Sequence, residues 1–137
     1  MKIRQKVFYA FAAAALFLAL PLNAVAAVED IGFSDVAADA WYADAVEYVR
    51  DNGLMSGTSG TTFSPEGMMT RAMLATTLYR EAGSPVVSGT DAFTDTQEGA
   101  WYSDAVLWVS QEGVISGYGN GLFGTNDPVT REQIAAI

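Results

Sequence analysis

The stretch FSDVAADAWYADAVEYVRDNGLMSG, residues 33–57, decides the fold because it occurs twice. It aligns without a gap on FTDTQEGAWYSDAVLWVSQEGVISG, residues 93–117, and the register of sixty residues continues to Ala75 and Ala135. Sixteen of the forty-five positions aligned between 33–77 and 93–137 are identical. A repeat of this length indicates a duplicated supersecondary unit, so the fold has to be considered as an array of units.

Each copy opens with an amphipathic helix, which we expect over residues 41–52 in the first copy with Asp39 as its N-cap. Apolar residues recur at the spacing of one helical face, at Tyr42, Ala45, Val46 and Val49 and again at Tyr102, Ala105, Val106 and Val109. Gly53 and Gly113 follow the two helices, where a left-handed C-terminal cap is expected.

The second helix of each copy is predicted to start after a threonine, Thr70 or Thr130, which caps it. Gln133 can complete a capping box with Thr130, whereas Met73 at the same place in the first copy cannot. The loops between the helices are rich in Gly, Ser, Thr, Asn and Pro, which favours turns. The chain is therefore predicted to be mainly α, built from tandem helix-loop-helix units.

The organisation that follows is a first repeat over 33–83, a linker over 84–92 and a second repeat over 93–137. The second repeat lacks a counterpart of LYREAG, residues 78–83, so we expect the sequence to be the front part of a longer protein, cut inside a helix. A unit of about fifty residues buries too little apolar surface to be stable alone and needs neighbours to stack on.

Residues 1–27 have the features of a signal peptide. Lys2, Arg4 and Lys6 precede an apolar run over 7–22, and NAVAA offers the small residues of a cleavage site. The run is shorter than the ~20 residues of a membrane span. We expect a cleaved export signal, with an uncleaved anchor as the alternative.

Cleavage would leave four arginines against sixteen carboxylates, a net charge of 4 − 16 = −12. Nucleic acid is then a poor partner, because binding to phosphates needs a basic surface. An acidic polymer would also be repelled at long range, so any anion has to be held by local contacts.

The chain has no cysteine and no histidine. This excludes disulfides, thiol chemistry, and Ser-His or Cys-His nucleophiles, and it leaves carboxylates as the main candidates for acid-base catalysis. No EF-hand spacing is present, so the acidity alone does not indicate a metal. The composition does not support an enzyme, a cofactor or a metal site.

Arg71 and Arg131 occupy one repeated position directly after the threonine caps. An arginine there places its charge at the positive end of the helix dipole, which is unfavourable by a few tenths up to ~1 kcal/mol. Each arginine heads the apolar face of its helix and should point toward a seam between packed helices. It could hold an anion there, or it could form an internal ion pair with Asp35, Asp95 or another carboxylate.

Three further pairs recur at the same register: Trp41 and Trp101, Asp35 and Asp95, and Gly57 and Gly117. The tryptophans stand at the rim of a helix and could stack on sugars, although packing is the alternative. The aspartates are typical of a turn or a cap. The glycines are expected to have positive φ in a turn, and they could also let a ligand approach the backbone.

Five features recur in the same order in both copies: F-x-D, a tryptophan before an Ala-Val helix, G-x-x-S-G, a loop phenylalanine (Phe63 or Phe123) and the Thr-Arg helix start. This ordered set resembles the S-layer homology (SLH) domain, the wall-anchoring module of bacterial surface proteins. The family usually writes its helix start TRAE, and the glutamate is replaced here by Met73 and Gln133.

The resemblance implies three units around a pseudo-threefold axis, of which a third is missing here. It also implies that the grooves between units hold secondary cell wall polysaccharide, often pyruvylated, whose carboxylate meets the Thr-Arg arginine. The implied ligand residues are Asp35, Trp41, Gly57, Arg71, Asp95, Trp101, Gly117 and Arg131.

The sequence therefore predicts an exported, non-enzymatic module that anchors a protein to the cell wall or surface layer. Two alternatives stay open. The chain could be the targeting part of a larger wall-associated enzyme, or a purely structural repeat that self-associates and whose arginines pair internally.

Overall fold

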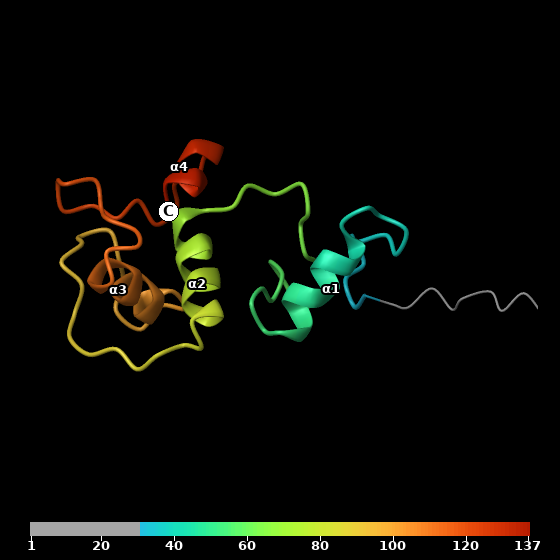
Figure 1. Cartoon of the computed structure of the whole chain (residues 1–137), viewed down its shortest axis with the longest axis horizontal. Helices are drawn as coiled ribbons and strands as arrows, with labels where there is room; N and C mark the ends of the chain where they lie inside the picture. Colours follow the sequence, from blue (N-terminus) through green and yellow to red (C-terminus); the bar gives the residue numbers. More distant parts are fainter. Residues whose placement is uncertain (1–30) are drawn as a thin grey trace, which may run out of the picture.

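The computed structural model describes residues 31–137, so the predicted signal peptide lies outside the described residues. It contains four helices: α1 (Ala43–Asp51), α2 (Arg71–Glu81), α3 (Ser103–Gln111) and α4 (Arg131–Ala136) (Figure 1). Residues 31–137 contain no strand, only an isolated antiparallel bridge between Thr70 and Pro128. The mainly α class is confirmed, while the threefold arrangement stays an expectation.

The first helix of each repeat begins later than predicted, because the chain first makes turns. In repeat 1 the Ala40 amide donates to the Ala37 carbonyl and the Ala43 amide to the Ala40 carbonyl. Tyr42 is the N-cap, and its side chain makes no capping bond. The prediction that Asp39 caps this helix is therefore wrong, since the helix starts a full turn beyond it.

The other predicted caps are present. Gly53 and Gly113 end α1 and α3 with φ of 68° and 69°, the left-handed region that glycine adopts without strain. Thr130 and Gln133 form the capping box, each side chain accepting from the other residue's amide. In α2 the hydroxyl of Thr70 accepts from the Met73 amide, and only this half of the box exists.

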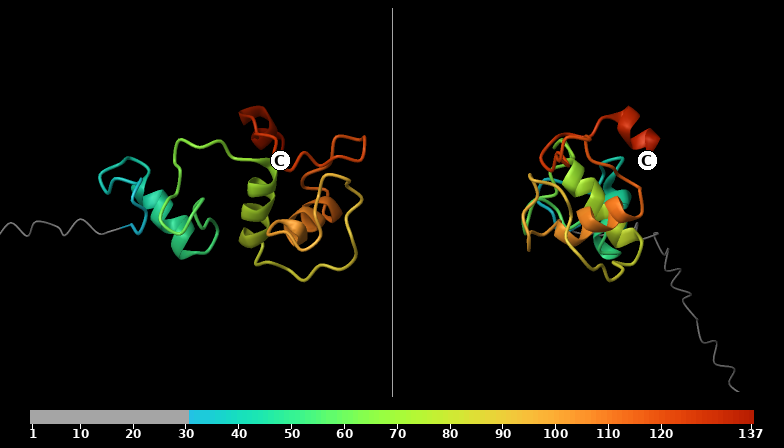
Figure 2. Two further views of the ribbon diagram at one scale, coloured as in Figure 1. Left: turned by 180° about the vertical axis from the view of Figure 1, so that it is seen from behind. Right: turned by 90° about the vertical axis from the view of Figure 1, so that its left-hand side faces the viewer.

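The two helices of one sequence repeat do not pack on each other. Within residues 31–137, α2 and α3 are the only helix pair in contact, although α2 belongs to repeat 1 and α3 to repeat 2. Figures 1 and 2 show α2 between α1 and α3 from both sides. The packing unit is thus shifted by one helix from the sequence repeat.

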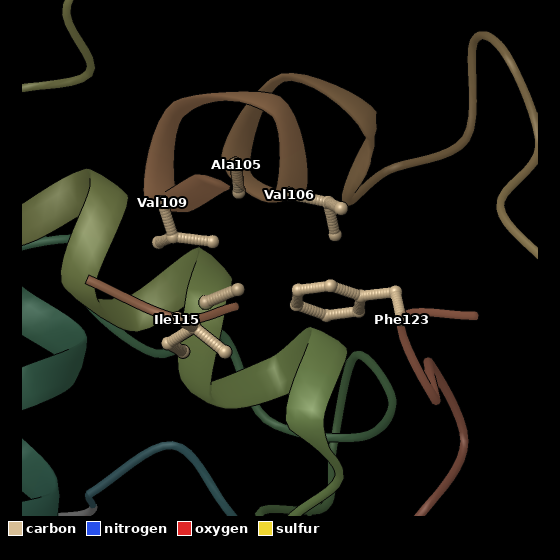
Figure 3. Packing of buried hydrophobic residues seen from close by; sticks show 6 residues of the cluster. Ala105, Val106, Val109, Ile115 and Phe123 are labelled. Atoms are coloured by element: carbon tan, nitrogen blue, oxygen red, sulfur yellow. The ribbon is translucent and has the colours of Figure 1, made fainter. Parts of the chain in front are cut away.

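The main core lies between α2, α3 and the loop that follows α3. Its buried members are Ala75, Ala105, Val106, Val109, Ile115 and Phe123. Figure 3 shows the valines of α3 directed at α2, with Phe123 closing one end of the cluster. A smaller cluster in repeat 1 consists of Ile31, Phe33, Val36, Ala43 and Val46.

The segment between α2 and α3 contains no helix or strand, as expected for a linker, but it is fastened at two points. The Tyr79 hydroxyl donates to the Pro85 carbonyl at 2.9 Å, and the Gln111 amide donates to the Ser88 carbonyl at 3.1 Å. Within residues 31–137, no helix has the length and apolar character needed to cross a bilayer.

Candidate functional site

Arg71 lies buried at the seam where α2 of repeat 1 meets the loop of repeat 2. Its Nε donates to the Phe123 carbonyl at 2.8 Å, and its Nη2 donates to the Ser116 carbonyl at 2.7 Å. The backbone is attached to the same loop, because the Arg71 amide donates to the Asp127 carbonyl at 2.9 Å. The arginine therefore joins two repeats.

Two aromatic rings complete the environment of this guanidinium. Its Cζ lies 4.7 Å from the centroid of the Tyr118 ring and 5.0 Å from that of Phe123, within the range of cation–π attraction. In residues 31–137 the only ion pairs join Arg50 to Glu47 and Asp51. The ion-pair interpretation of Arg71 is therefore wrong, since carbonyl oxygens and ring faces surround its charge.

One amino group of Arg71 keeps its capacity to donate. Nη1 has no hydrogen bond within the described range, and that range contains no fully buried side-chain nitrogen or oxygen without a partner. Nη1 therefore keeps contact with solvent even though the residue is only 6% exposed. An anion at the seam would find a charged donor already fixed in position by the other two bonds.

Asp95 and Asp35 hold the loops after α3 and α1. The Asp95 carboxylate accepts from the amides of Phe123 and Gly124, both at 2.7 Å, and more weakly from Thr125. Asp35 accepts from the Phe63 amide at 2.8 Å and the Ser64 amide at 2.7 Å. The predicted role in a local turn or cap is therefore wrong for these carboxylates, because each binds amides 28 to 30 residues further along the chain.

These amides also act on the acidity of the carboxyls. At Asp95 partial burial raises the pKa, but the donated amides outweigh it, so the pKa lies below its usual value. At Asp35 the Phe63 amide is the largest influence, and it too lowers the pKa. Both groups are therefore carboxylates near neutral pH. Asp95 fixes the loop that presents the Phe123 carbonyl to Arg71.

Tyr118 borders the exposed side of the seam. Its hydroxyl donates to Asp127 at 3.0 Å. Burial raises the pKa of Tyr118 and the bond to Asp127 adds to this effect, while the charge of Arg71 opposes it. The hydroxyl is thus protonated near neutral pH and remains a hydrogen-bond donor.

The glycine predictions are only partly confirmed. Gly57 has φ of 77°, as expected, but Gly117 is outside the left-handed region, and its predicted positive φ is wrong. What the two share is close packing: a Cβ at Gly57 would overlap the Phe33 ring, and one at Gly117 would overlap the Phe93 ring. The loop has to pass close to the aromatic residue of F-x-D.

The two tryptophans lie on the surface, so the packing alternative is wrong for them. Trp41 is 94% exposed and Trp101 63% exposed. Each indole forms a T-shaped ring pair with the next tyrosine, with ring centroids 5.4 Å apart for Trp41 and Tyr42 and 5.2 Å apart for Trp101 and Tyr102. Both leave a flat apolar surface open to solvent.

A groove of about 450 Å³ lies between the loop of repeat 1 and α2. Gly57 and Trp101 line it, together with Arg80, which sequence reasoning did not single out. Arg80 donates from Nη1 to the Leu54 carbonyl at 3.2 Å and to the Ser56 hydroxyl at 3.1 Å. No sequence signal identified it, because it has no counterpart in the second repeat.

Arg131 does not repeat the environment of Arg71. It is exposed, and within residues 31–137 it has no hydrogen-bond or ion-pair partner, since no other helix contacts α4. The prediction that both arginines point into a seam is therefore confirmed for Arg71 and wrong for Arg131 in this chain. Among the candidate residues, Arg71, Asp95 and Gly117 lie at the seam between the repeats. Gly57 and Trp101 line the groove.

The described residues contain no group of three acidic side chains placed to hold a metal ion. The seam combines a fixed guanidinium, a tyrosine hydroxyl and nearby backbone, and exposed indoles lie at the helix starts. A guanidinium can donate hydrogen bonds to an anion, and an exposed indole has a face on which a sugar ring can stack.

The family model of the S-layer homology domain matches residues 32–73 and 92–135. The chain belongs to this family. It is 34% identical over 106 residues to an S-layer protein, sap, of Bacillus anthracis, 33% over 105 residues to an endoglucanase of a Bacillus species, and 30% over 119 residues to a cellulosome-anchoring protein of Acetivibrio thermocellus.

These alignments cover 77%, 77% and 84% of this chain but only 13%, 11% and 27% of the respective relatives. The chain therefore spans less than a third of each of these proteins. The two segments that the family model matches contain residues 33–57 and 93–117, which define the repeat from the sequence alone.

Proposed function

We propose that this chain anchors an exported protein non-covalently to the bacterial cell wall by binding secondary wall polysaccharide. The names of its relatives, an S-layer protein and a cellulosome-anchoring protein, support a place at the cell surface. The chain acts as a binding module and not as a catalyst. The observation that carries the proposal is the buried Arg71, held by two carbonyls with Nη1 left for a ligand.

In this proposal Nη1 of Arg71 donates to a carboxylate of the polymer, such as a pyruvate ketal. Two bonds already hold the guanidinium, so little side-chain entropy is lost when the ligand binds. The Tyr118 ring lies 4.7 Å from the guanidinium carbon, and Gly117 directly follows Ser116, whose carbonyl binds Arg71, so both residues can contact the attached sugar. Trp41 and Trp101 offer exposed faces on which further sugar rings can stack.

The strong negative charge of the chain is compatible with an acidic polymer only if the contact is local. Four arginines face sixteen carboxylates outside the predicted signal. A charge-assisted bond at a largely buried guanidinium is screened less by salt than an exposed one. Binding should therefore weaken only partly in moderate salt.

The test is co-sedimentation of the exported chain with cell walls. Walls that retain their secondary polysaccharide should bind it, and walls stripped of that polymer by mild acid should not. Arg71→Lys should weaken binding per folded molecule, because lysine keeps the charge but loses the planar fork. Arg50→Lys is the matched control, since Arg50 contacts Glu47, Asp51 and Ile31 away from the seam. Equal binding to both wall preparations would remove the proposal.

The similarity to an endoglucanase favours a second candidate, in which the anchor is the targeting part of a larger wall-associated enzyme. The two candidates share the same polysaccharide site. The mass and glucanase activity of the protein extracted from cell walls with an antibody against residues 33–117 distinguish them. A purely structural repeat, the third candidate, predicts no difference between native and stripped walls.

A further inference from the structure

The tripeptide Asn-Gly-Leu occurs twice in the described part of the chain, at 52–54 and at 120–122. In an Asn-Gly pair the asparagine side chain is open to attack by the next backbone nitrogen, because glycine has no Cβ to obstruct it. Both asparagines are exposed, and a Cβ added to either glycine would meet no neighbouring group. Gly53 and Gly121 also share a positive φ, of 68° and 81°. Sequence and exposure therefore do not distinguish the two pairs.

The hydrogen bonding of the attacking nitrogen does distinguish them. The Gly53 amide donates to the Arg50 carbonyl at 2.9 Å, at the end of α1, whereas the Gly121 amide makes no hydrogen bond within residues 31–137. The amide that follows Asn126 is bonded too, to the Gly124 carbonyl at 3.0 Å. Among the asparagines of the described range, only the one that opens the second tripeptide is followed by a free amide.

The carbonyl that would be attacked also differs between the two pairs. Oδ1 of Asn120 accepts from the Leu122 amide at 3.2 Å. Negative charge develops on this oxygen when a nitrogen adds to Cγ, so the amide stabilises the reaction where the charge appears. Asn52 is bonded through its nitrogen instead, which donates to the Tyr48 carbonyl at 2.8 Å, and its Oδ1 accepts from no donor in the described residues.

We infer that Asn120 is a site of spontaneous deamidation that the fold promotes, whereas the fold protects Asn52. The Gly121 nitrogen loses its proton to hydroxide and forms a bond to Cγ. The Cγ–Nδ2 bond then breaks, and ammonia leaves with a proton from water, which gives a cyclic imide. Water opens this ring at the Cγ–N bond, giving an ordinary aspartate, or at the backbone C–N bond, giving isoaspartate. Water and hydroxide are the only other reactants.

The isoaspartate product should loosen the seam between the repeats. The Tyr118 amide donates to the Leu122 carbonyl at 2.8 Å and so closes the loop around position 120, and the next carbonyl, that of Phe123, binds Arg71. In isoaspartate the backbone runs through Cβ and Cγ, which inserts one carbon inside this closed loop. The Leu122 and Phe123 carbonyls then cannot both keep their positions. An ordinary aspartate leaves the backbone length unchanged and can still accept from the Leu122 amide.

The first experiment compares the two tripeptides in one sample. The exported chain is kept folded at mildly alkaline pH, and peptide mapping by mass spectrometry follows deamidation at both positions over time. Since one hydrogen bond of the attacking amide corresponds to about a tenfold change in rate, Asn120 should react about tenfold faster than Asn52 or more. In urea that unfolds the chain the two rates should converge, because the reacting residues are identical. Equal rates in the folded chain, or a difference that persists in urea, would overturn the inference.

The second experiment measures the effect on the seam. Fresh and aged samples of the native chain and of Asn120→Gln are unfolded in urea, since the longer glutamine side chain cyclises much more slowly. The native midpoint should fall as isoaspartate accumulates, and that of Asn120→Gln should not change with age. Fresh Asn120→Asp, which has the charge but not the longer backbone, should unfold close to the native midpoint. Isoaspartate without a loss of stability, or an equal loss in Asn120→Gln, would contradict the link to the seam. No polysaccharide is present, so the outcome is independent of the proposed wall binding.

Discussion

The two Thr-Arg helix starts offer a comparison of one residue type at one register position in two environments. Arg71 is buried and bonded, whereas Arg131 is exposed and without a partner in residues 31–137. Replacing each by alanine should therefore affect the free energy of unfolding very differently. We expect Arg71→Ala to be strongly destabilising and Arg131→Ala to be nearly neutral.

The magnitude for Arg71→Ala follows from what the change leaves behind. Losing a donor costs about 1–3 kcal/mol for each acceptor stranded away from water. The Phe123 carbonyl belongs to a fully buried residue and has no alternative partner, but Ser116 is exposed and its carbonyl can bind water. The two ring contacts add about 0.5–1 kcal/mol each. Removing the charge from the helix start returns a few tenths of a kcal/mol.

The expected loss is therefore about 2–4 kcal/mol for Arg71→Ala, from the terms just given. Arg131→Ala, a surface change, should stay within about 0.5 kcal/mol of the native chain. The assay is urea unfolding followed by tryptophan fluorescence, in which Trp108, packed on Tyr79 at the α2–α3 contact, reports this core. Equal losses for the two variants, or a loss below about 0.5 kcal/mol at Arg71, would refute the assignment of Arg71 as the bond between repeats.

Two further predictions concern the loops. The lowered pKa values of Asp35 and Asp95 mean that the carboxylates stabilise the fold fully above the ordinary aspartate pKa of about 3.9. The free energy of unfolding should fall as the pH drops below about 4 and through the folded-state values, and urea titrations should show a smaller fall for Asp95→Asn. Gly117→Ala should destabilise the chain although its φ is unstrained, because the added Cβ meets Phe93; an alanine variant with an unchanged urea midpoint would contradict the packing argument.

Features set by short-range physics could be predicted from the sequence. The helical class follows from the apolar spacing, the left-handed caps at Gly53 and Gly113 from the freedom of glycine, and the capping box from the hydroxyl of Thr130. Each depends on residues within one or two helical turns. The error at Asp39 is also local. Two turns precede α1, and the apolar spacing along the helix gives no sign of them.

The partners of Arg71 could not be predicted, because they depend on which helix packs against which loop. Both interpretations of the sequence looked for a charged partner, an anion or a carboxylate. The structure provides backbone carbonyls 45 and 52 residues away. Because every residue has such a carbonyl, the residue types in the sequence do not indicate which ones will accept. The burial of Arg71 at the head of an apolar face was predictable, but the atoms that stabilise it were not.

The shift between sequence repeat and packing unit explains why identical positions behave differently. A duplicated helix-loop-helix has one register in the sequence, but its second helix completes the core of the next copy. Each copy therefore depends on the helix before it, so α3 is covered by α2 while α1 has no cover among residues 31–137. Identity at Arg71 and Arg131 consequently predicts the same capacity to bind carbonyls, not the same environment. Whether that capacity is used depends on the presence of a neighbouring loop.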